Sequence, residues 1–308
     1  MTSANSSYGL VPDVIYTFSD GWNQAQALAE KCGAALGLID VHRFPDGESL
    51  ITAPPEARAA GGTVALYRSL YDPNAKLTEV MLAAQAIRTL GAKTLILIAP
   101  YLPYMRQDKA FAPGQAVSQS ALGAYLGGIF DTIVTIEAHL HRTSSLDHVF
   151  APAQVLVIGA GHAIAQSLRN HTSIPTVVVG PDEESEHLIK EVVEILGTSW
   201  FTARKVRHGD NDVKVTLPPD LKIEGHPVVI VDDIISSGGT VAELAKALKH
   251  AGAGAISAYA VHALFDQRAA FVMRRAGVSE IKSMSTIPHT TNAIDIVDLL
   301  CGALGMHK

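Results

Sequence analysis

The stretch Val228-Val-Ile-Val-Asp-Asp-Ile-Ile-Ser-Ser-Gly-Gly-Thr240 decides the fold of this chain. Its aliphatic start is typical of a buried parallel strand, which is apolar on both faces. Asp232 and Asp233 follow at the expected carboxyl end of that strand, where open α/β sheets place their ligands. Gly238 and Gly239 let an anion approach the backbone at the start of a helix, whose N-terminus favours negative charge. The segment therefore predicts a phosphate loop beside two carboxylates that could hold vicinal hydroxyls or a metal ion.

A helix is predicted directly after this loop. Val241, Leu244, Ala245 and Leu248 recur at helical spacing, and Gly252 is placed to end the helix. Strand, acidic pair, glycine-rich turn and helix in this order fit the binding of a sugar phosphate, which carries both an anion and hydroxyl groups. The alternative interpretation is an ordinary βα turn with two solvated aspartates.

Strand and helix patterns alternate along the rest of the chain, which predicts parallel sheets flanked by helices. Apolar runs typical of buried strands lie at residues 94–99, 132–136, 155–158, 176–179 and 256–261. The predicted fold class is α/β, with two doubly wound domains and parallel central sheets. The expected domains are residues 1–150 and 151–290, followed by residues 291–308 as a C-terminal helix that returns to the first domain.

The two expected domains share a pattern. Residues 95–101 and 228–234 both run from an aliphatic strand into a loop, about one domain apart. This repeat favours a duplicated fold in which only the second copy keeps a phosphate loop, although convergent strand patterns would look the same. Residues 293–300 form the expected C-terminal helix.

The composition limits the classes of function. The chain has 308 residues and a formal net charge of −6, so it has no basic excess for general binding to nucleic acid. Cys32 and Cys301 have no metal-ligand spacing and form no disulfide framework, which indicates a reducing compartment. No signal-peptide pattern and no apolar run of membrane-spanning length are present. We therefore expect a cytoplasmic protein that binds neither nucleic acid nor a membrane.

Two further motifs precede the phosphate loop. Arg43-Phe-Pro-Asp-Gly-Glu48 is a compact turn whose aromatic ring could stack on a base and whose carboxylates could accept hydrogen bonds from an amino group. Tyr104-Met-Arg-Gln-Asp-Lys109 follows a predicted strand and continues as a loop, so Arg106 and Lys109 could close over a triphosphate. Taken alone, the first motif is typical of a surface turn and the second fits a solvated charged loop.

The three motifs in this order resemble those of ribose-phosphate pyrophosphokinases, the phosphoribosyl-diphosphate (PRPP) synthetase family. The resemblance covers nearly the whole chain, whereas simple phosphoribosyltransferases share only the last motif. It leans toward an archaeal-like or divergent branch, because the phosphate loop reads Ser-Ser-Gly-Gly-Thr and the second loop is short. It implies a type I phosphoribosyltransferase-like fold for both domains.

The resemblance implies roles for individual residues. The residues expected to bind ATP are Phe44, Asp46, Glu48, Arg106, Gln107, Asp108 and His139. Those expected to bind ribose 5-phosphate are Asp182, Asp232, Asp233, Ser236, Ser237, Gly238, Gly239 and Thr240. Lys205 and Arg207 match the catalytic basic pair, and His139 and Asp182 match residues associated with Mg²⁺.

The function that the resemblance implies is ribose-phosphate diphosphokinase activity. The diphosphoryl group of ATP would pass to the C1 hydroxyl of ribose 5-phosphate, which gives PRPP and AMP. Such chemistry requires positioning and charge stabilisation more than covalent catalysis. The resemblance also implies a homo-oligomer, a dimer or higher, in which Phe44 and its turn reach an adenine site at a subunit interface.

Some residues depart from the family's pattern. Glu137 stands where the family usually has aspartate in the sequence before His139, and Ala110 and Ala112 stand at places that are often more basic. The run Pro181-Asp-Glu-Glu-Ser is also more acidic than usual.

Two alternative functions therefore stay open. Glu137 and Ala110 keep open a first alternative, a non-catalytic regulatory protein associated with a PRPP synthetase, although the retained Lys205, Arg207 and acidic pair argue against it. A second alternative is a phosphoribosyltransferase that consumes PRPP, but such enzymes have a single domain and lack an ATP-binding turn.

Overall fold

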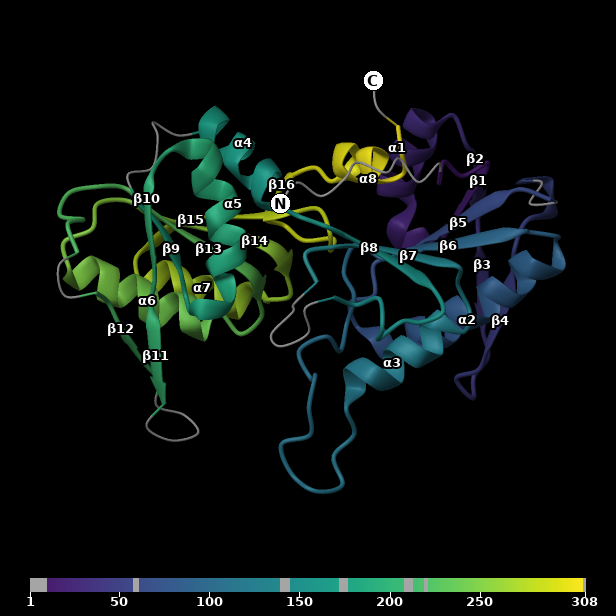
Figure 1. Cartoon of the computed structure of the whole chain (residues 1–308), viewed down its shortest axis with the longest axis horizontal. Helices are drawn as coiled ribbons and strands as arrows, with labels where there is room; N and C mark the ends of the chain where they lie inside the picture. The colour runs from purple at the N-terminus through teal and green to yellow at the C-terminus, as the bar shows by residue number, and fades with distance from the viewer. Residues whose placement is uncertain are drawn as a thin grey trace. The chain divides into compact units, whose positions relative to one another are not determined.

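The computed structural model divides the chain into two compact units. The first consists of Met1–Ile158 and Ile296–Lys308, and the second is Gly159–Asp295. Figure 1 shows that each unit is built around its own sheet. The residues that the structure describes are 10–57, 61–138, 145–171, 177–207, 213–218 and 221–306.

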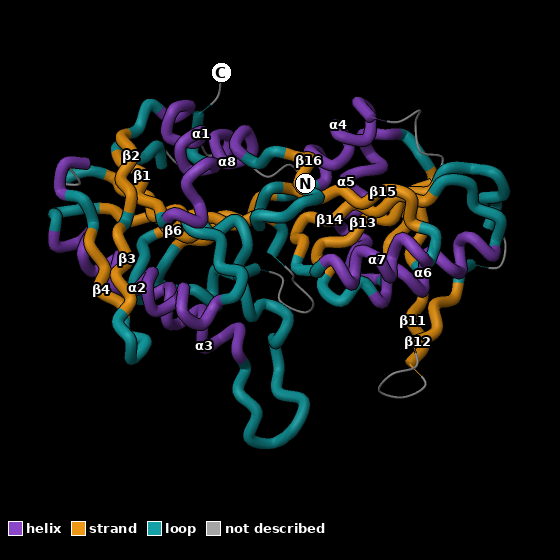
Figure 2. Tube along the Cα trace, turned by 180° about the vertical axis from the view of Figure 1, so that it is seen from behind, coloured by secondary structure: helices purple, strands orange, loops and turns teal. Residues whose placement is uncertain are grey.

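The first unit has a six-stranded parallel sheet with the strand order β2-β1-β5-β6-β7-β8. α1 and α8 cover one face of this sheet, and α2 and α3 cover the other (Figures 1 and 2). The aliphatic runs of the central strands are fully buried, as expected for a sheet covered on both faces. The strands are β1 (Val14–Thr17), β2 (Ala35–Leu38), β5 (Thr63–Tyr67), β6 (Thr94–Ile98), β7 (Thr132–Ile136) and β8 (Gln154–Ile158), and the helices are α1 (Trp22–Cys32), α2 (Pro73–Thr89), α3 (Ser118–Gly127) and α8 (Val297–Ala303).

The second unit has a six-stranded parallel sheet with the order β10-β9-β13-β14-β15-β16. α4 and α5 lie on one face and α6 and α7 on the other (Figures 1 and 2). The strands are β9 (Val177–Gly180), β10 (Ser199–Thr202), β13 (Val228–Ile235), β14 (Ile256–Ala263), β15 (Val278–Met284) and β16 (Asn292–Ile294), and the helices are α4 (Gly161–His171), α5 (Glu186–Leu196), α6 (Gly239–His250) and α7 (Gln267–Arg275).

The two units have the same strand order. In each sheet, the strand that comes second along the chain lies on one side of the first, and the strand that comes third along the chain lies on the other side. Each unit also has an antiparallel hairpin between its second and third sheet strands: β3 (Asp40–Arg43) with β4 (Ser49–Thr52), and β11 (Arg204–Arg207) with β12 (Val213–Thr216). Ligands of such folds bind where the strand order reverses, which is between β1 and β5 in the first unit and between β9 and β13 in the second.

This topology confirms the predicted α/β fold and corrects the predicted internal repeat. By its place in the sheet, β13 corresponds to β5. The segment 95–101, which resembled it in sequence, belongs to β6 and corresponds to β14. Buried parallel strands have similar aliphatic composition, so composition alone could not separate β5 from β6.

The C-terminal segment differs from the sequence-based expectation. Ala293 and Ile294 belong to β16 of the second unit, and the helix α8 begins only at Val297. α8 packs on α1 and β8 of the first unit. The first unit also runs past residue 150 to Ile158, because β8 completes its sheet. Within the described part of the chain, no helix is long and apolar enough to cross a membrane.

Candidate functional site

The acidic pair lies where the second sheet opens. Pairing between β9 and β13 ends at Ile230, whereas pairing between β13 and β14 continues to Ile235. Asp232 and Asp233 therefore lie inside β13 rather than at its end, which corrects the sequence-based expectation. They nevertheless lie beyond Ile230, the last residue of β13 that pairs with β9. The two aspartates are therefore at the place where the strand order reverses. Both aspartates are half-buried.

The glycine-rich loop follows the acidic pair directly. Gly238 is the N-cap of α6 and has a φ of +69°, a left-handed conformation that strains any residue with a Cβ atom. Ser236 and Ser237 are exposed, and the Ser237 hydroxyl lies 3.5 Å from the Gly239 amide. The first amides of an α-helix lack partners within the helix. The loop thus presents backbone donors, hydroxyl groups and a helix N-terminus together, a combination that suits a phosphate.

Asp182 lies at the same edge of the sheet, shortly after β9. Its carboxylate caps the short 3₁₀ helix Glu183–Ser185 and accepts a hydrogen bond from the Glu184 amide at 3.2 Å. The Ser185 hydroxyl donates to the Asp182 carbonyl at 2.7 Å. The structure therefore gives Asp182 a capping role and brings three carboxylates to the reversal of the strand order. The predicted roles of these residues toward ribose and metal stay predictions.

A pocket of 360 Å³ opens beside the glycine-rich loop. Asp266 caps α7 by accepting a hydrogen bond from the Ala269 amide at 2.8 Å, and the exposed Arg268 follows it. Sequence reasoning missed both residues, although an acidic cap directly after the strand that neighbours β13 is a signal that could have found them. The pocket is lined by Ser236, Ser237, Leu264, Asp266, Arg268, Ala269 and Val272.

His289 holds the loop that leads into this pocket. Its Nε2 donates to the Phe265 carbonyl at 2.8 Å, and its Nδ1 accepts from the Thr291 amide at 3.3 Å. A nitrogen that donates and a nitrogen that accepts define the neutral Nε2–H tautomer. His289 thereby fixes the backbone next to Asp266, and its ring also lies edge-on to Phe265.

Lys205 and Arg207, the predicted catalytic pair, belong to β11. Lys205 pairs with Val215 of β12, and Arg207 pairs with Val213. Their side chains lie outside the described part of the structure, so the geometry places only their backbone in the hairpin of the second unit. His139 also lies outside the described residues.

In the first unit, three residues after neighbouring strands adopt a strained backbone. Asp72, Tyr104 and Glu137 have φ angles of 50°, 65° and 44°, and they follow β5, β6 and β7 respectively. A left-handed conformation is uncommon for residues other than glycine and tends to occur at functional sites. The strain therefore marks the carboxyl edge of the first sheet, which carries the loop predicted to bind ATP.

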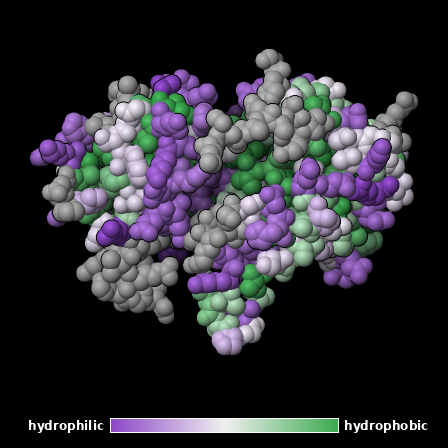
Figure 3. All heavy atoms as spheres, in the orientation of Figure 1, coloured by the Kyte–Doolittle hydropathy of each residue, from purple (hydrophilic) through white to green (hydrophobic). Residues whose placement is uncertain are grey.

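The second predicted ATP motif is attached to α3. The Gln107 side-chain oxygen accepts a hydrogen bond from Ser118 at 2.5 Å, and its carbonyl accepts one from the Gln119 amide at 3.2 Å. Arg106 is exposed and Asp108 is half-buried. Beyond them the loop projects from the unit and carries hydrophobic side chains among polar ones (Figures 1 and 3), including Phe111, which is 67% exposed.

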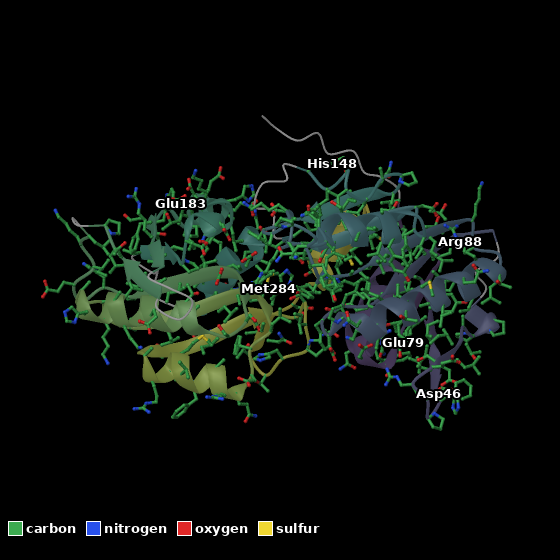
Figure 4. All side chains as sticks on the ribbon, turned by 90° about the horizontal axis from the view of Figure 1, so that it is seen from below. Asp46, Glu79, Arg88, His148, Glu183 and Met284 are labelled. Atoms are coloured by element: carbon green, nitrogen blue, oxygen red, sulfur yellow. The ribbon has the colours of Figure 1, made fainter. Side chains whose placement is uncertain are left out.

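The first predicted ATP motif forms the tip of the β3–β4 hairpin. The Gly47 amide donates to the Phe44 carbonyl at 3.0 Å, and the Glu48 amide donates to the Asp46 carboxylate at 3.1 Å. Gly47 has a φ of +92°, which the turn requires. Figure 4 shows Asp46 at the outer end of the hairpin, and Phe44, Asp46 and Glu48 are all exposed.

A network of charged side chains occupies the strand-order reversal of the first unit. Arg68, directly after β5, is buried and lies 2.7 Å from Glu79 and 3.5 Å from Asp20. Lys76 of α2 lies 2.6 Å from Asp20. The Arg68 guanidinium also stacks over the Phe18 ring at 3.8 Å. The charges therefore compensate one another in the place where the second unit has its phosphate loop.

Family models match both halves of the chain. Residues 14–126 match the N-terminal domain of ribose phosphate pyrophosphokinase, and residues 151–296 match the phosphoribosyl transferase domain. The crystal structure of phosphoribosylpyrophosphate synthetase from Mycobacterium smegmatis has a similar fold. It gives a TM-score of 0.81 at 21% sequence identity and covers 95% of this chain and 97% of that chain.

Sequence relatives extend over nearly the full length, and most are archaeal. The ribose-phosphate pyrophosphokinase of Methanopyrus kandleri is 33% identical over 285 residues, or 92% of this chain and 95% of that protein. The ribose-phosphate pyrophosphokinase of Sulfolobus acidocaldarius is 32% identical over 277 residues, or 89% of this chain and 93% of that protein. With both halves matched in order and such identity over this length, the chain belongs to the ribose-phosphate pyrophosphokinase family.

Proposed function

We propose that this protein is a ribose-phosphate diphosphokinase, which transfers the diphosphoryl group of ATP to the C1 hydroxyl of ribose 5-phosphate and releases AMP. The main support is the arrangement at the reversal of the second sheet, where an acidic pair lies beside a glycine-rich helix N-terminus. The loop from Ser236 to Thr240 would hold the 5-phosphate through backbone amides and hydroxyls. Asp232 and Asp233 would accept hydrogen bonds from the ribose hydroxyls.

The nucleotide would bind through the first unit. Phe44 at the hairpin tip would stack on adenine, and Asp46 and Glu48 would accept hydrogen bonds from its amino group. Arg106, Gln107, Asp108 and His139 would contact the rest of ATP. We further propose that the hairpin serves the adenine site of a neighbouring copy, which makes the active form a homo-oligomer of at least two chains.

Catalysis would depend on positioning and on compensation of phosphate charge. Lys205 and Arg207 would stabilise negative charge that develops on the transferred group. Among the described residues, no group of three or more His, Cys, Asp or Glu could hold a metal ion alone. Mg²⁺ keeps several waters and binds few protein carboxylates together with substrate phosphates, so the half-buried carboxylate of Asp182 suits it as an outer partner. His139, which lies outside the described residues, is proposed for a similar role from the family resemblance alone. When bound, it would supply charge neutralisation to the phosphates.

The reaction is tested by AMP release that depends on ribose 5-phosphate. We expect AMP and PRPP in equal amounts when Mg²⁺, ATP and ribose 5-phosphate are all present, and no AMP when the sugar is omitted. A regulatory protein without catalysis would bind ligands but release no AMP, and a phosphoribosyltransferase would consume added PRPP. Either result would replace the proposed function. We place the reaction in the cytoplasm, in agreement with two cysteines that form no disulfide.

A further inference from the structure

Glu79 of α2 holds the base of the β3–β4 hairpin. Arg43, the last residue of β3, donates two hydrogen bonds to the Glu79 carboxylate, from Nε at 3.1 Å and from Nη2 at 2.8 Å. Ser49, which pairs with Arg43 across the hairpin, donates to the same oxygen at 3.4 Å. Both strands of the hairpin are therefore fixed to one carboxylate on a neighbouring helix.

Glu79 is itself held in place from the other side. Its side chain is only 2% exposed, and the second carboxylate oxygen lies 2.7 Å from the guanidinium of the buried Arg68. Burial alone would raise the pKa of Glu79, but the hydrogen bond from Arg43 and the charge of Arg68 together lower the pKa below its usual value. The carboxylate thus stays ionised and links the hairpin to the charge network of the first unit.

The two faces of the hairpin differ in character. Val41 and Ile51, which lie on the same face as Arg43, pack against the core of the first unit. The opposite face carries His42 and Leu50, and Leu50 is 54% exposed. The packing of Val41 and Ile51 and the contact with Glu79 together keep the face with His42 and Leu50 toward solvent.

The outer face includes the predicted adenine-stacking residue. Phe44 is 41% exposed and packs edge-to-face on His42, with ring centroids 4.7 Å apart and planes at 83°. The tip beyond Phe44 is fixed by its own turn hydrogen bonds. The orientation of the tip relative to the first sheet is therefore set at the base of the hairpin, where Arg43 meets Glu79.

We propose that Glu79 is a positioning residue for the nucleotide, which acts through Arg43 and Ser49 to hold the His42–Phe44 face ready for adenine. His42 supports the ring of Phe44 from its edge. This inference rests on the proposed function, because it assigns the hairpin tip to adenine binding. A hairpin released from Glu79 would sample other orientations, and ATP binding would have to restore the order.

The test uses Arg43→Ala, because Arg43 is 64% exposed and its loss leaves Glu79 paired with Arg68. We expect the KM for ATP to rise about tenfold while the KM for ribose 5-phosphate stays within about twofold. Amide hydrogen exchange in residues 40–52 should become faster without any nucleotide. Arg43→Lys, which keeps the charge but loses the paired donors, should give a smaller rise in the KM for ATP.

The matched control is Arg88→Ala on the same helix. Arg88 forms an ion pair with Asp131 at 2.7 Å and lies about 14 Å along α2 from Glu79 (Figure 4). This control should leave both KM values and the exchange of the hairpin unchanged. Equal rises in both KM values for Arg43→Ala, or faster exchange with an unchanged KM for ATP, would overturn the inference.

Calorimetric binding of ATP separates this inference from the proposed function. If wild-type protein binds ATP but releases no AMP, the proposed function fails, and weaker ATP binding by Arg43→Ala still supports the positioning role. If Arg43→Ala and wild-type protein bind ATP equally, the positioning role fails even when AMP release is normal. Absence of ATP binding by the wild-type protein would overturn both.

Discussion

The reversal of the strand order is occupied differently in the two units. In the second unit, pairing between β9 and β13 ends early, and Asp232, Asp233 and the glycine-rich loop lie at the opening. In the first unit, Arg68 and Lys76 are paired with Glu79 and Asp20 at the equivalent place. The comparison teaches that the shared topology creates the location of a site, while the residues that follow the strands decide whether it can receive a ligand.

The hairpins extend the comparison. Each unit has an antiparallel hairpin between the second and third strands of its sheet, counted along the chain. The first-unit hairpin carries the predicted adenine turn, and the second-unit hairpin carries Lys205 and Arg207. One inserted element thus appears twice in the chain with different proposed tasks, which are binding in the first unit and catalysis in the second.

The largest expected effect concerns the second hairpin. Lys205→Ala should lower the turnover number roughly 10³-fold while calorimetry shows unchanged ATP binding, because a cation that acts mainly in the transition state contributes little to ground-state affinity. Lys222→Ala removes an exposed lysine of the same unit outside the hairpin and should leave turnover unchanged. Near-normal PRPP production by Lys205→Ala would refute the proposed division of tasks between the hairpins.

The charge network of the first unit gives the next effect. Glu79→Gln should lower the free energy of unfolding at pH 7 by about 3 kcal/mol, because the buried Arg68 loses the nearer of its two carboxylate partners. The folded-state pKa of Glu79 lies below the usual 4.5, so its contribution is complete above that value and is lost as the pH falls through the folded-state pKa.

Chemical denaturation between pH 7 and pH 3 checks this expectation. The stability difference between wild-type protein and Glu79→Gln should be constant at neutral pH and shrink in acid. A difference that stays constant down to pH 3 would show that the ionised carboxylate is not the source of the stability.

The network also shows where sequence reasoning reached its limit. Residues 132–136 are all β-branched, which predicts a strand with the bounds that β7 has, because such residues are typical of buried strands. Asp20, Arg68 and Glu79 carry no such signal. They lie in or directly after separate elements, none follows a recognisable motif, and only the fold brings them together.

The helix predicted over residues 293–300 begins too early, for a different reason. Residues 293–300 contain Ile294 and Ile296, which alternate as in a strand, and Val297 and Leu300, which are spaced as in a helix. Both patterns are present in the structure, since β16 contains Ile294 and α8 contains Val297 and Leu300. A single periodicity across the segment could not detect the change between them.

The acidic pair provides the third prediction. Asp232→Asn combined with Asp233→Asn should weaken ribose 5-phosphate binding about 10- to 100-fold, because hydrogen bonds to charged groups are stronger than neutral ones. Calorimetric titration with the sugar phosphate measures the loss, and ATP affinity should not change. Glu243→Gln, on the exposed side of the following helix, is the control for charge alone. Unchanged sugar affinity in the double variant would remove the ribose assignment.

The smallest expected effect concerns Gly238, whose counterpart for comparison is Gly302 in α8. Gly238→Ala should destabilise the protein by about 1 kcal/mol, because its φ of +69° strains a residue with a Cβ atom. The added carbon would also lie 3.1 Å from the Met273 side chain. Since the same backbone conformation directs the loop amides, ribose 5-phosphate affinity should fall together with the melting temperature.

Gly302→Ala separates backbone strain from a general effect of the substitution. Gly302 is inside a helix, and a Cβ atom there would meet nothing within 4 Å, so alanine should stabilise the helix by about 0.5–1 kcal/mol. Thermal unfolding should therefore shift in opposite directions for the two variants, with sugar affinity altered only by Gly238→Ala. If the melting temperatures of both variants rise and both bind the sugar equally well, the left-handed conformation of Gly238 does not shape the loop. The contrast between the two units must then come from the acidic pair alone.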